Sequence, residues 1–306
     1  MKYAQLGTSG VEASRVALGV MRISEKSPEE AVKIITTAMD CGINFFDTAD
    51  VYGAGKSSQV LGHALKDAGI ARDKVIVQTK FGIVAGKRYD FSKKHLLEAL
   101  DFELNNLGVD YVDFALLHRP DTLVELDQVA EAFNELQNSG KVRHFGVSNV
   151  NPRQTELLQS AVDQKLEVNQ LQFGLGHTGM VEQEFHVNMS DASSVDHDGG
   201  IIAYSRLKKM TIQAWSPFQY GFFEGVFVDN PKFPELNAKL EELAKKYDST
   251  KNGIATAWIL RHPAQMQVIL GSMNPTRIQQ MAAGAEVTLE PQEWYDLYFA
   301  AGNDLP

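Results

Sequence analysis

Residues 27–46, SPEEAVKIITTAMDCGINFF, join a helix signal to a strand signal, and this unit decides the fold. Ser27 is a typical N-cap, and Glu30 three residues later completes a capping box. Gly42 predicts the end of the helix. The run INFF (43–46) that follows is short and continuously apolar, as expected for a strand covered on both faces. Helix and strand alternating in this way are typical of a parallel sheet.

The same pattern recurs along the whole chain. Eight short apolar runs are the predicted strands: VALGV (16–20), INFF (43–46), VIVQT (75–79), DFALL (113–117), HFGVS (144–148), LEVNQ (166–170), IQAW (212–215) and QVIL (267–270). Helical segments fill the gaps, and eight such units favour an α/β fold closed into a (β/α)8 TIM barrel. We expect residues 1–306 to form a single barrel domain. A short N-terminal β-hairpin, YAQL and VEAS joined by GTSG, precedes the first strand.

Composition narrows the class of protein. Hydrophobic residues make up 44% and charged residues 22%, which is ordinary for a soluble globular protein. The net charge of -10 argues against a nucleic acid or an anionic membrane as the main partner, because both attract basic surfaces. A single cysteine, Cys41, excludes an intramolecular disulfide and favours a reducing compartment. No stretch resembles a signal peptide or a membrane span, so a cytoplasmic location is expected.

The stretch GLGHTG (174–179) fits the Gly-x-Gly-x-x-Gly pattern of a dinucleotide-binding turn, and Asp198 lies roughly 20 residues further on. Two features argue against that interpretation. Two glutamates, Glu182 and Glu184, follow within five residues, which is a poor surface for a phosphate, and the stretch follows the sixth strand rather than the first. We therefore expect it to begin an extended loop after strand 6. The polar, acidic stretch up to residue 200 is interpreted as either a lid over a pocket or a solvated loop.

Reactive side chains stand at the C-terminal ends of three successive strands, where barrel enzymes place their chemistry. Asp47 ends the second strand and Tyr52 follows it, Lys80 ends the third, and His118 ends the fourth. A lysine ammonium beside a phenol favours the phenolate, lowers the phenol pKa and eases proton donation. Asp47 would hold that lysine, and a neutral His118 would orient a substrate oxygen. The set suits protonation of a carbonyl oxygen as a hydride arrives at its carbon.

Each of these residues also has a structural interpretation. Asp47 fits a turn cap, Tyr52 a rim aromatic, Lys80 a solvated strand end and His118 a structural histidine. Their conjunction at three successive strand ends favours the catalytic interpretation.

Seven motifs, in order, carry a resemblance to a known family. They are FFDTADVYG (45–53), QTK (78–80), LLH (116–118), FGVSN (145–149), VNQ (168–170), AWSPF (214–218) and GSMNPTRI (271–278). The chain resembles the aldo-keto reductases, which are NAD(P)H-dependent (β/α)8 barrels, over nearly its whole length. The resemblance implies that Tyr52 is the proton donor, that Lys80 and Asp47 tune it, and that His118 orients the substrate.

The resemblance also implies a site for the cofactor. Ser148, Asn149 and Gln170 would bind the nicotinamide carboxamide, and Trp215 would stack on or flank the ring. The segment Ser216, Pro217, Phe218 and Gln219 would run along the pyrophosphate, and Gln280 would reach the adenine. Gly271 lies in the last motif, where many relatives carry lysine. Ser272 and Arg277 precede or begin a helix, whose N-terminus favours an anion, so they would bind a 2′-phosphate and favour NADPH over NADH.

Other functions remain open at this point. Some barrels of this family work mainly as NADPH-binding or redox-sensing subunits with little turnover. A hydrolase with paired carboxylates is a weaker alternative, because no second acidic residue stands at an obvious strand end to partner Asp47. We expect a small carbonyl substrate, no nucleic acid, no membrane and no metal. Phe81, Phe218, Tyr220 and Phe222 are candidates for an apolar substrate pocket.

Overall fold

The computed structural model describes residues 1–306 and contains a closed barrel of eight parallel strands. Each strand pairs with the next one along the chain, and the last pairs with the first. The barrel strands are β3 (Val16–Gly19), β4 (Phe45–Asp47), β5 (Ile76–Phe81), β8 (Val112–Leu117), β9 (Val142–Ser148), β10 (Leu166–Gln172), β11 (Thr211–Trp215) and β14 (Gln267–Leu270). All eight predicted strands, and the predicted TIM barrel, are confirmed.

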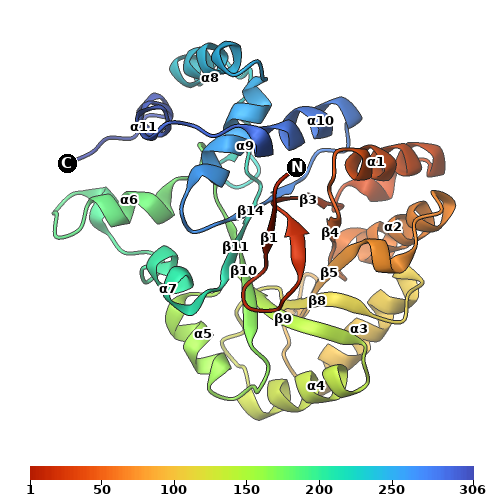
Figure 1. Cartoon of the computed structure of the whole chain (residues 1–306). Helices are drawn as coiled ribbons and strands as arrows, with labels where there is room; N and C mark the ends of the chain where they lie inside the picture. Colours follow the sequence, from red (N-terminus) through yellow and green to blue (C-terminus); the bar gives the residue numbers. More distant parts are fainter.

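Helices surround the barrel on all sides (Figure 1). The α-helices are α1 (Pro28–Asp40), α2 (Lys56–Asp67), α3 (Lys93–Leu107), α4 (Leu126–Asn138), α5 (Pro152–Gln159), α6 (Gly179–Phe185), α7 (Ile201–Lys208), α8 (Pro234–Lys246), α9 (Lys251–Arg261), α10 (Pro275–Ala283) and α11 (Pro291–Ala300). Single 3-10 turns are η1 (Ile23–Glu25), η2 (Tyr52–Gly55), η3 (Arg72–Lys74), η4 (Ala192–Ser194) and η5 (Gly284–Glu286). The predicted capping box of Ser27 and Glu30 is present at the start of α1. None of the helices is long and apolar enough to cross a membrane.

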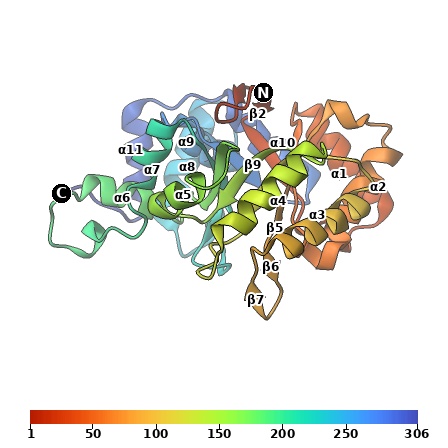
Figure 2. The ribbon, with the colours of Figure 1, turned by 90° about the horizontal axis from the view of Figure 1, so that it is seen from below.

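Three small hairpins lie outside the barrel. They are β1 (Tyr3–Gln5) with β2 (Glu12–Ser14), β6 (Ile83–Val84) with β7 (Arg88–Tyr89), and β12 (Gln219–Tyr220) with β13 (Gly225–Val226). The first is the predicted N-terminal hairpin, and its Leu6 packs inside the barrel with Phe45, Phe114 and Val168. This hairpin therefore covers one end of the barrel, and Figure 2 shows the β6–β7 hairpin projecting from the opposite side.

The long connection after β10 differs in part from the predicted loop, because it contains the short helix α6. Met180 and Val181 of this helix are buried, and the Phe185 ring lies edge-on to Tyr298 with 5.4 Å between ring centroids. Tertiary packing against α11 thus stabilises a helix in a segment whose polar composition suggested a loop.

The glycines of GLGHTG have a packing role. A Cβ atom on Gly174 would lie 2.2 Å from the carbonyl oxygen of Pro217, and one on Gly176 would lie 2.6 Å from that of Gln219. Only glycine permits this close approach of two backbones. The stretch therefore supports residues 216–219 from behind, which explains the glycines without a dinucleotide.

Candidate active site

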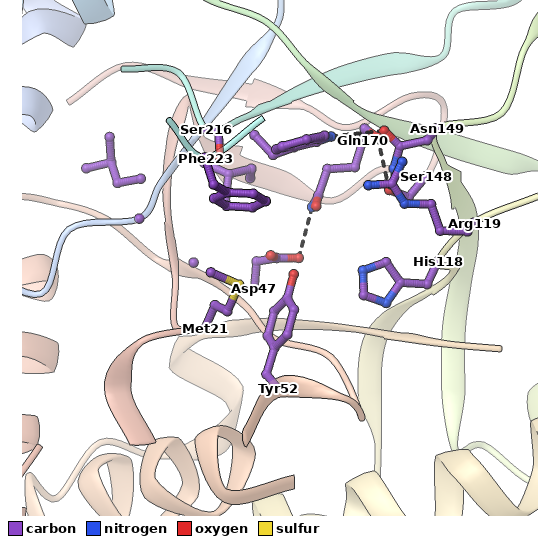
Figure 3. A pocket seen from close by; sticks show the side chains of 15 residues that line it. Met21, Asp47, Tyr52, His118, Arg119, Ser148, Asn149, Gln170, Ser216 and Phe223 are labelled. Carbon is purple, nitrogen blue, oxygen red and sulfur yellow. Dashed lines mark hydrogen bonds between the residues drawn. The ribbon is translucent and has the colours of Figure 1, made fainter. Parts of the chain in front are cut away.

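The four predicted catalytic residues come together at the end of the barrel where the strands terminate. Asp47 is the last residue of β4, Tyr52 begins η2, and His118 directly follows β8. These three line one cavity of about 160 Å³, which we call the catalytic cavity (Figure 3). Lys80, near the end of β5, is fully buried next to it.

Lys80 and Asp47 form a close, buried ion pair. Lys80 Nζ lies 2.7 Å from Asp47 Oδ1 and 2.8 Å from Oδ2, and it also donates to the Thr48 carbonyl at 2.7 Å. Burial lowers the pKa of Lys80, but the Asp47 charge and the contacts with Asp47 and Tyr52 together outweigh burial, so the pKa lies above its ordinary value. Lys80 is therefore a cation held in place by three acceptor oxygens.

A row of glutamine side chains inside the barrel orients Asp47. Gln78 Nε2 donates to Asp47 Oδ1 at 2.7 Å and lies 2.8 Å from Gln213 Oε1. Gln213 donates in turn to Gln267, which donates to the carbonyl of Ser14. This chain of buried hydrogen bonds restricts the position of the carboxylate. The Asp47 carboxylate is thus held from behind as well as by Lys80.

The turn that carries Tyr52 is sharply bent and packed against α3. Gly53 and Ala54 both have positive φ, at 57° and 53°. A Cβ atom on Gly55 would lie 2.5 Å from the Phe102 ring, so this position requires glycine. The turn leaves the Tyr52 ring 5.0 Å from Lys80 Nζ, measured to the ring centroid.

The pKa of Tyr52 departs from the sequence prediction. Burial raises the pKa of the Tyr52 hydroxyl, and the Lys80 charge opposes this effect without overcoming it. Lys80 thus acts in the predicted direction, but the expected net fall in the pKa is wrong, because burial, which a sequence motif does not record, raises the pKa more. The phenol remains a protonated donor at neutral pH.

His118 is held neutral. Its ring lies edge-on to the Tyr52 ring with 5.8 Å between centroids, and its Nδ1 is buried without a hydrogen-bond partner. Burial lowers the pKa of His118 well below its ordinary value, and the charges of Lys80 and Arg119 lower it further. Figure 3 shows Tyr52 and His118 facing the same space, so both can reach one substrate oxygen.

We expect the His118 imidazole to be neutral at pH 6.5 and to show no titration there, since its folded-state pKa lies well below 6.5. Protonation would place a third positive charge beside Lys80 and Arg119. The measurement is a titration of the imidazole NMR signals, with His118 assigned from the spectrum of the His118→Asn variant. An inflection of the His118 signal near pH 6.5 would contradict the neutral assignment.

Residues predicted to bind the nicotinamide line the catalytic cavity. Ser148, Asn149, Gln170 and Trp215 are all among its lining residues. The Trp215 indole donates to Asn149 Oδ1 at 3.2 Å, and Asn149 donates to Ser148 Oγ at 2.8 Å. These contacts fix the Trp215 ring at the cavity wall, so one face of a bound planar ring could rest against it.

A second cavity of about 130 Å³ adjoins the first and shares Met21, Ser216, Phe223 and Gly271 with it. Most of the residues predicted along the pyrophosphate and adenosine phosphate line it: Ser216, Pro217, Phe218, Gln219, Gly271, Ser272 and Arg277. The helix α10 begins here, capped by Asn274, whose side chain accepts from Arg277 N. Gln280 is not among the lining residues, and its amide oxygen accepts from Asn252.

Several lining residues were not identified from the sequence. Met21 and Arg22 follow β3, and the strand-end rule that found Asp47 also applies to them. Phe223 carries no such signal, because it lies between β12 and β13. Its ring stacks near Trp215, with 6.2 Å between centroids and 23° between planes, and it lines both cavities.

A third, outer cavity of about 510 Å³ shares Arg119, Asn149 and Trp215 with the catalytic cavity. Its lining is mixed. The polar residues are Arg119, Asn149, Asn151, Gln154, Gln172, His177, His197 and Asp198, and the apolar ones are Val150, Leu171, Met180, Ile201, Trp215 and Phe222. Of the aromatics considered for an apolar pocket, only Phe222 lies here. Phe81 is fully buried, Phe218 lines the second cavity, and Tyr220 packs on Phe233.

Comparison with known proteins agrees with this geometry. Residues 15–298 match the model of the family described as the aldo/keto reductase family. The chain belongs to the aldo/keto reductase family. It is thus an oxidoreductase of that family, and members act on small carbonyl compounds.

The chain is similar in sequence to several named reductases and oxidoreductases. One relative is a 6-dehydroglucose reductase from Agrobacterium fabrum, 33% identical over 96% of this chain and 97% of that protein. Another is the oxidoreductase YdhF of Escherichia coli, 31% identical over 98% of both. Among solved structures, an aldo-keto reductase from Klebsiella pneumoniae in complex with NADPH has a TM-score of 0.77 at 22% identity, covering 97% of this chain and 93% of that one. At this level of identity, the structural similarity shows a shared fold.

Proposed function

We propose that this aldo/keto reductase reduces an aldehyde or ketone to an alcohol with NADPH, and that Tyr52 donates the proton. The observation that carries the proposal is the convergence of Tyr52, His118 and Asp47 on one cavity, with the Lys80 ammonium bound by both Asp47 oxygens. We also propose that residues 1–306 work as one domain.

The residues have separable tasks in this proposal. NADPH, when bound, supplies the hydride to the carbonyl carbon. His118, neutral, hydrogen-bonds the carbonyl oxygen and fixes its direction. Tyr52 keeps its proton until negative charge develops on that oxygen and then donates it. The resulting phenolate is stabilised by Lys80, whose charge is held in place by Asp47.

The second cavity supports NADPH as the cofactor. The N-terminus of α10 and the Ser272 hydroxyl present donors, and the Arg277 guanidinium adds a permanent positive charge. Helix N-termini with an arginine are suited to a phosphate group such as the 2′-phosphate that distinguishes NADPH from NADH. The Klebsiella pneumoniae protein of similar fold was solved with NADPH.

The outer cavity supports a polyhydroxylated substrate. Its amide, imidazole and guanidinium groups offer both donors and acceptors, and Trp215 and Phe222 offer flat apolar faces. That combination suits a sugar-like aldehyde better than an aliphatic one, whose chain would leave those polar groups unpaired. Two relatives at 33% and 31% identity are named 6-dehydroglucose reductases.

The proposal is tested by following NADPH oxidation with a panel of carbonyls. Polyhydroxylated aldehydes, simple aliphatic aldehydes and simple ketones are assayed at matched concentrations, each with NADPH and with NADH. We expect the highest kcat/KM for a polyhydroxylated carbonyl with NADPH. Absence of turnover across the panel contradicts the reductase, and a preference for aliphatic aldehydes contradicts the substrate class alone.

We expect Arg277→Met to weaken NADPH binding by roughly 10- to 100-fold and to leave NADH binding nearly unchanged, because an ionic hydrogen bond is worth about 1.5–3 kcal/mol. Fluorescence titration of each nucleotide gives the two Kd values. Arg153→Met is the matched control, since Arg153 is exposed on α5 and pairs with Glu156. Equal loss of affinity for both nucleotides would show that Arg277 does not contact the 2′-phosphate.

A further inference from the structure

A buried carboxylate on α3 lies behind the Asp47–Lys80 pair and has no place in the mechanism above. Glu103 is completely buried. Its Oε2 accepts a hydrogen bond from Ser58 Oγ at 2.8 Å and another from Thr79 Oγ1 at 2.7 Å. Ser58 Oγ is also 2.8 Å from Thr48 Oγ1, and since Ser58 donates to Glu103, Thr48 donates to Ser58. Three hydroxyls therefore converge, directly or through Ser58, on one carboxylate oxygen.

The hydroxyl-bearing residues are the sequence neighbours of the ion pair. Thr48 follows Asp47, and Thr79 precedes Lys80. Because adjacent side chains on a strand point to opposite faces, the pair points into the barrel while the two threonines point toward the helices. Figure 1 shows α2, which carries Ser58, and α3, which carries Glu103, alongside β4 and β5. Glu103 thus ties both strands to the helix layer at the level of the reacting groups.

Packing alone does not explain a carboxylate at this position. Burial raises the pKa of Glu103, and the hydrogen bonds from Thr79 and Ser58 oppose this effect. A second acid, Asp50, is buried nearby, and burial together with the Glu103 charge raises its pKa to about 7. Placing two acids away from water is costly, and an apolar side chain of equal volume would fill the same space at lower cost.

We propose that Glu103 is a positioning residue for the Asp47–Lys80 pair, acting through the Thr48, Ser58 and Thr79 hydroxyls, and that it thereby aligns Lys80 for proton donation by Tyr52. The inference rests on the proposed reductase function. In this proposal, α3 contributes to catalysis through Glu103, although Glu103 contacts neither substrate nor cofactor.

The test compares Glu103→Met with Glu103→Gln in the full chain. Methionine keeps the volume and removes the acceptor, whereas glutamine keeps an oxygen that accepts from both hydroxyls. We expect Glu103→Met to lower kcat at least roughly tenfold, since small misplacements of reacting groups cost one to two powers of ten. KM for the carbonyl and Kd for NADPH should stay within about twofold, and the solvent isotope effect on kcat should rise because proton donation becomes slower. Glu103→Gln should restore most of kcat.

Two controls separate positioning from loss of folded protein. NADPH titration gives the concentration of competent sites, and Glu98→Met removes an exposed acid from the same helix. If Glu103→Met does not fold, Thr79→Val removes one of the two direct donors, and we expect the same pattern with a smaller fall in kcat. A normal kcat per competent site in Glu103→Met overturns the inference. If Glu103→Met does not fold, a normal kcat per competent site in Thr79→Val overturns it instead. An equal loss of kcat in Glu103→Met and Glu103→Gln also overturns it. Failure of the reductase itself is recognised separately, by absence of turnover in the wild type or full turnover in Tyr52→Phe.

Discussion

Replacing Tyr52 with phenylalanine is expected to slow carbonyl reduction by roughly 10²- to 10⁴-fold, the usual contribution of a positioned general acid. The substitution removes one hydroxyl and keeps the ring, so the edge-on contact with His118 and the packing beside Lys80 remain. No other group on the cavity wall combines a proton to give with this position, because His118 is neutral with a strongly lowered pKa and Lys80 is buried.

The measurement is kcat for the best carbonyl substrate together with Kd for NADPH. We expect Kd to stay within about twofold, because Tyr52 lies at the part of the cavity that faces the substrate oxygen. Tyr89→Phe serves as the matched control, since Tyr89 is an exposed tyrosine on β7. Normal turnover by Tyr52→Phe would contradict the assignment of Tyr52 as the proton donor.

Replacing Lys80 with methionine is expected to lower both stability and activity. Removal of one partner from a buried ion pair leaves the other charge uncompensated and typically costs 3–5 kcal/mol. We expect about 3 kcal/mol, the lower end, because Gln78 and Gln170 continue to donate to Asp47. Activity should fall by more than roughly 10²-fold, since the phenolate left by proton donation loses its cation.

The double variant Lys80→Met with Asp47→Asn separates the two effects. It removes the orphaned charge, so we expect part of the lost stability in urea unfolding to return while activity stays low. An unchanged free energy of unfolding in Lys80→Met would contradict the buried ion pair. Recovery of activity in the double variant would show that the pair serves folding alone.

The barrel was predictable because its strands are covered on both faces. VALG in β3 and VDFALL in β8 are buried at every position, and such strands read as largely apolar runs, interrupted in β8 only by Asp113. The convergence of Asp47, Tyr52, Lys80 and His118 was predictable for a related reason. Parallel strands in a barrel bring their C-terminal ends to one rim, whatever the distance in sequence.

Features set by tertiary packing were not predictable. Helix α6 is stabilised by its contacts with α11, and these contacts cannot be predicted from the polar sequence of α6 itself. The raised pKa of Tyr52 depends on burial by residues from several elements, and no local motif records burial. Phe223 reaches the cavities from a hairpin whose two-residue strands are too short to give a periodic signal.

GLGHTG shows how a motif match depends on its structural context. The glycines occur at the spacing of a dinucleotide turn, yet Gly174 and Gly176 face the carbonyls of Pro217 and Gln219. Their lack of side chains lets the segment expected to run along the pyrophosphate lie close behind the cavity. Glycines that are needed for close packing can therefore match the sequence pattern of a dinucleotide-binding turn.

The central claim is direct hydride delivery from reduced nicotinamide to a carbonyl carbon in the catalytic cavity. It is tested by supplying NADPH deuterated at C4, on each face in turn, with the preferred carbonyl, and by analysing the alcohol by mass spectrometry. We predict one deuterium on the carbinol carbon with one of the two labelled cofactors and none with the other. An alcohol that lacks deuterium with both, or no alcohol at all, would contradict the account.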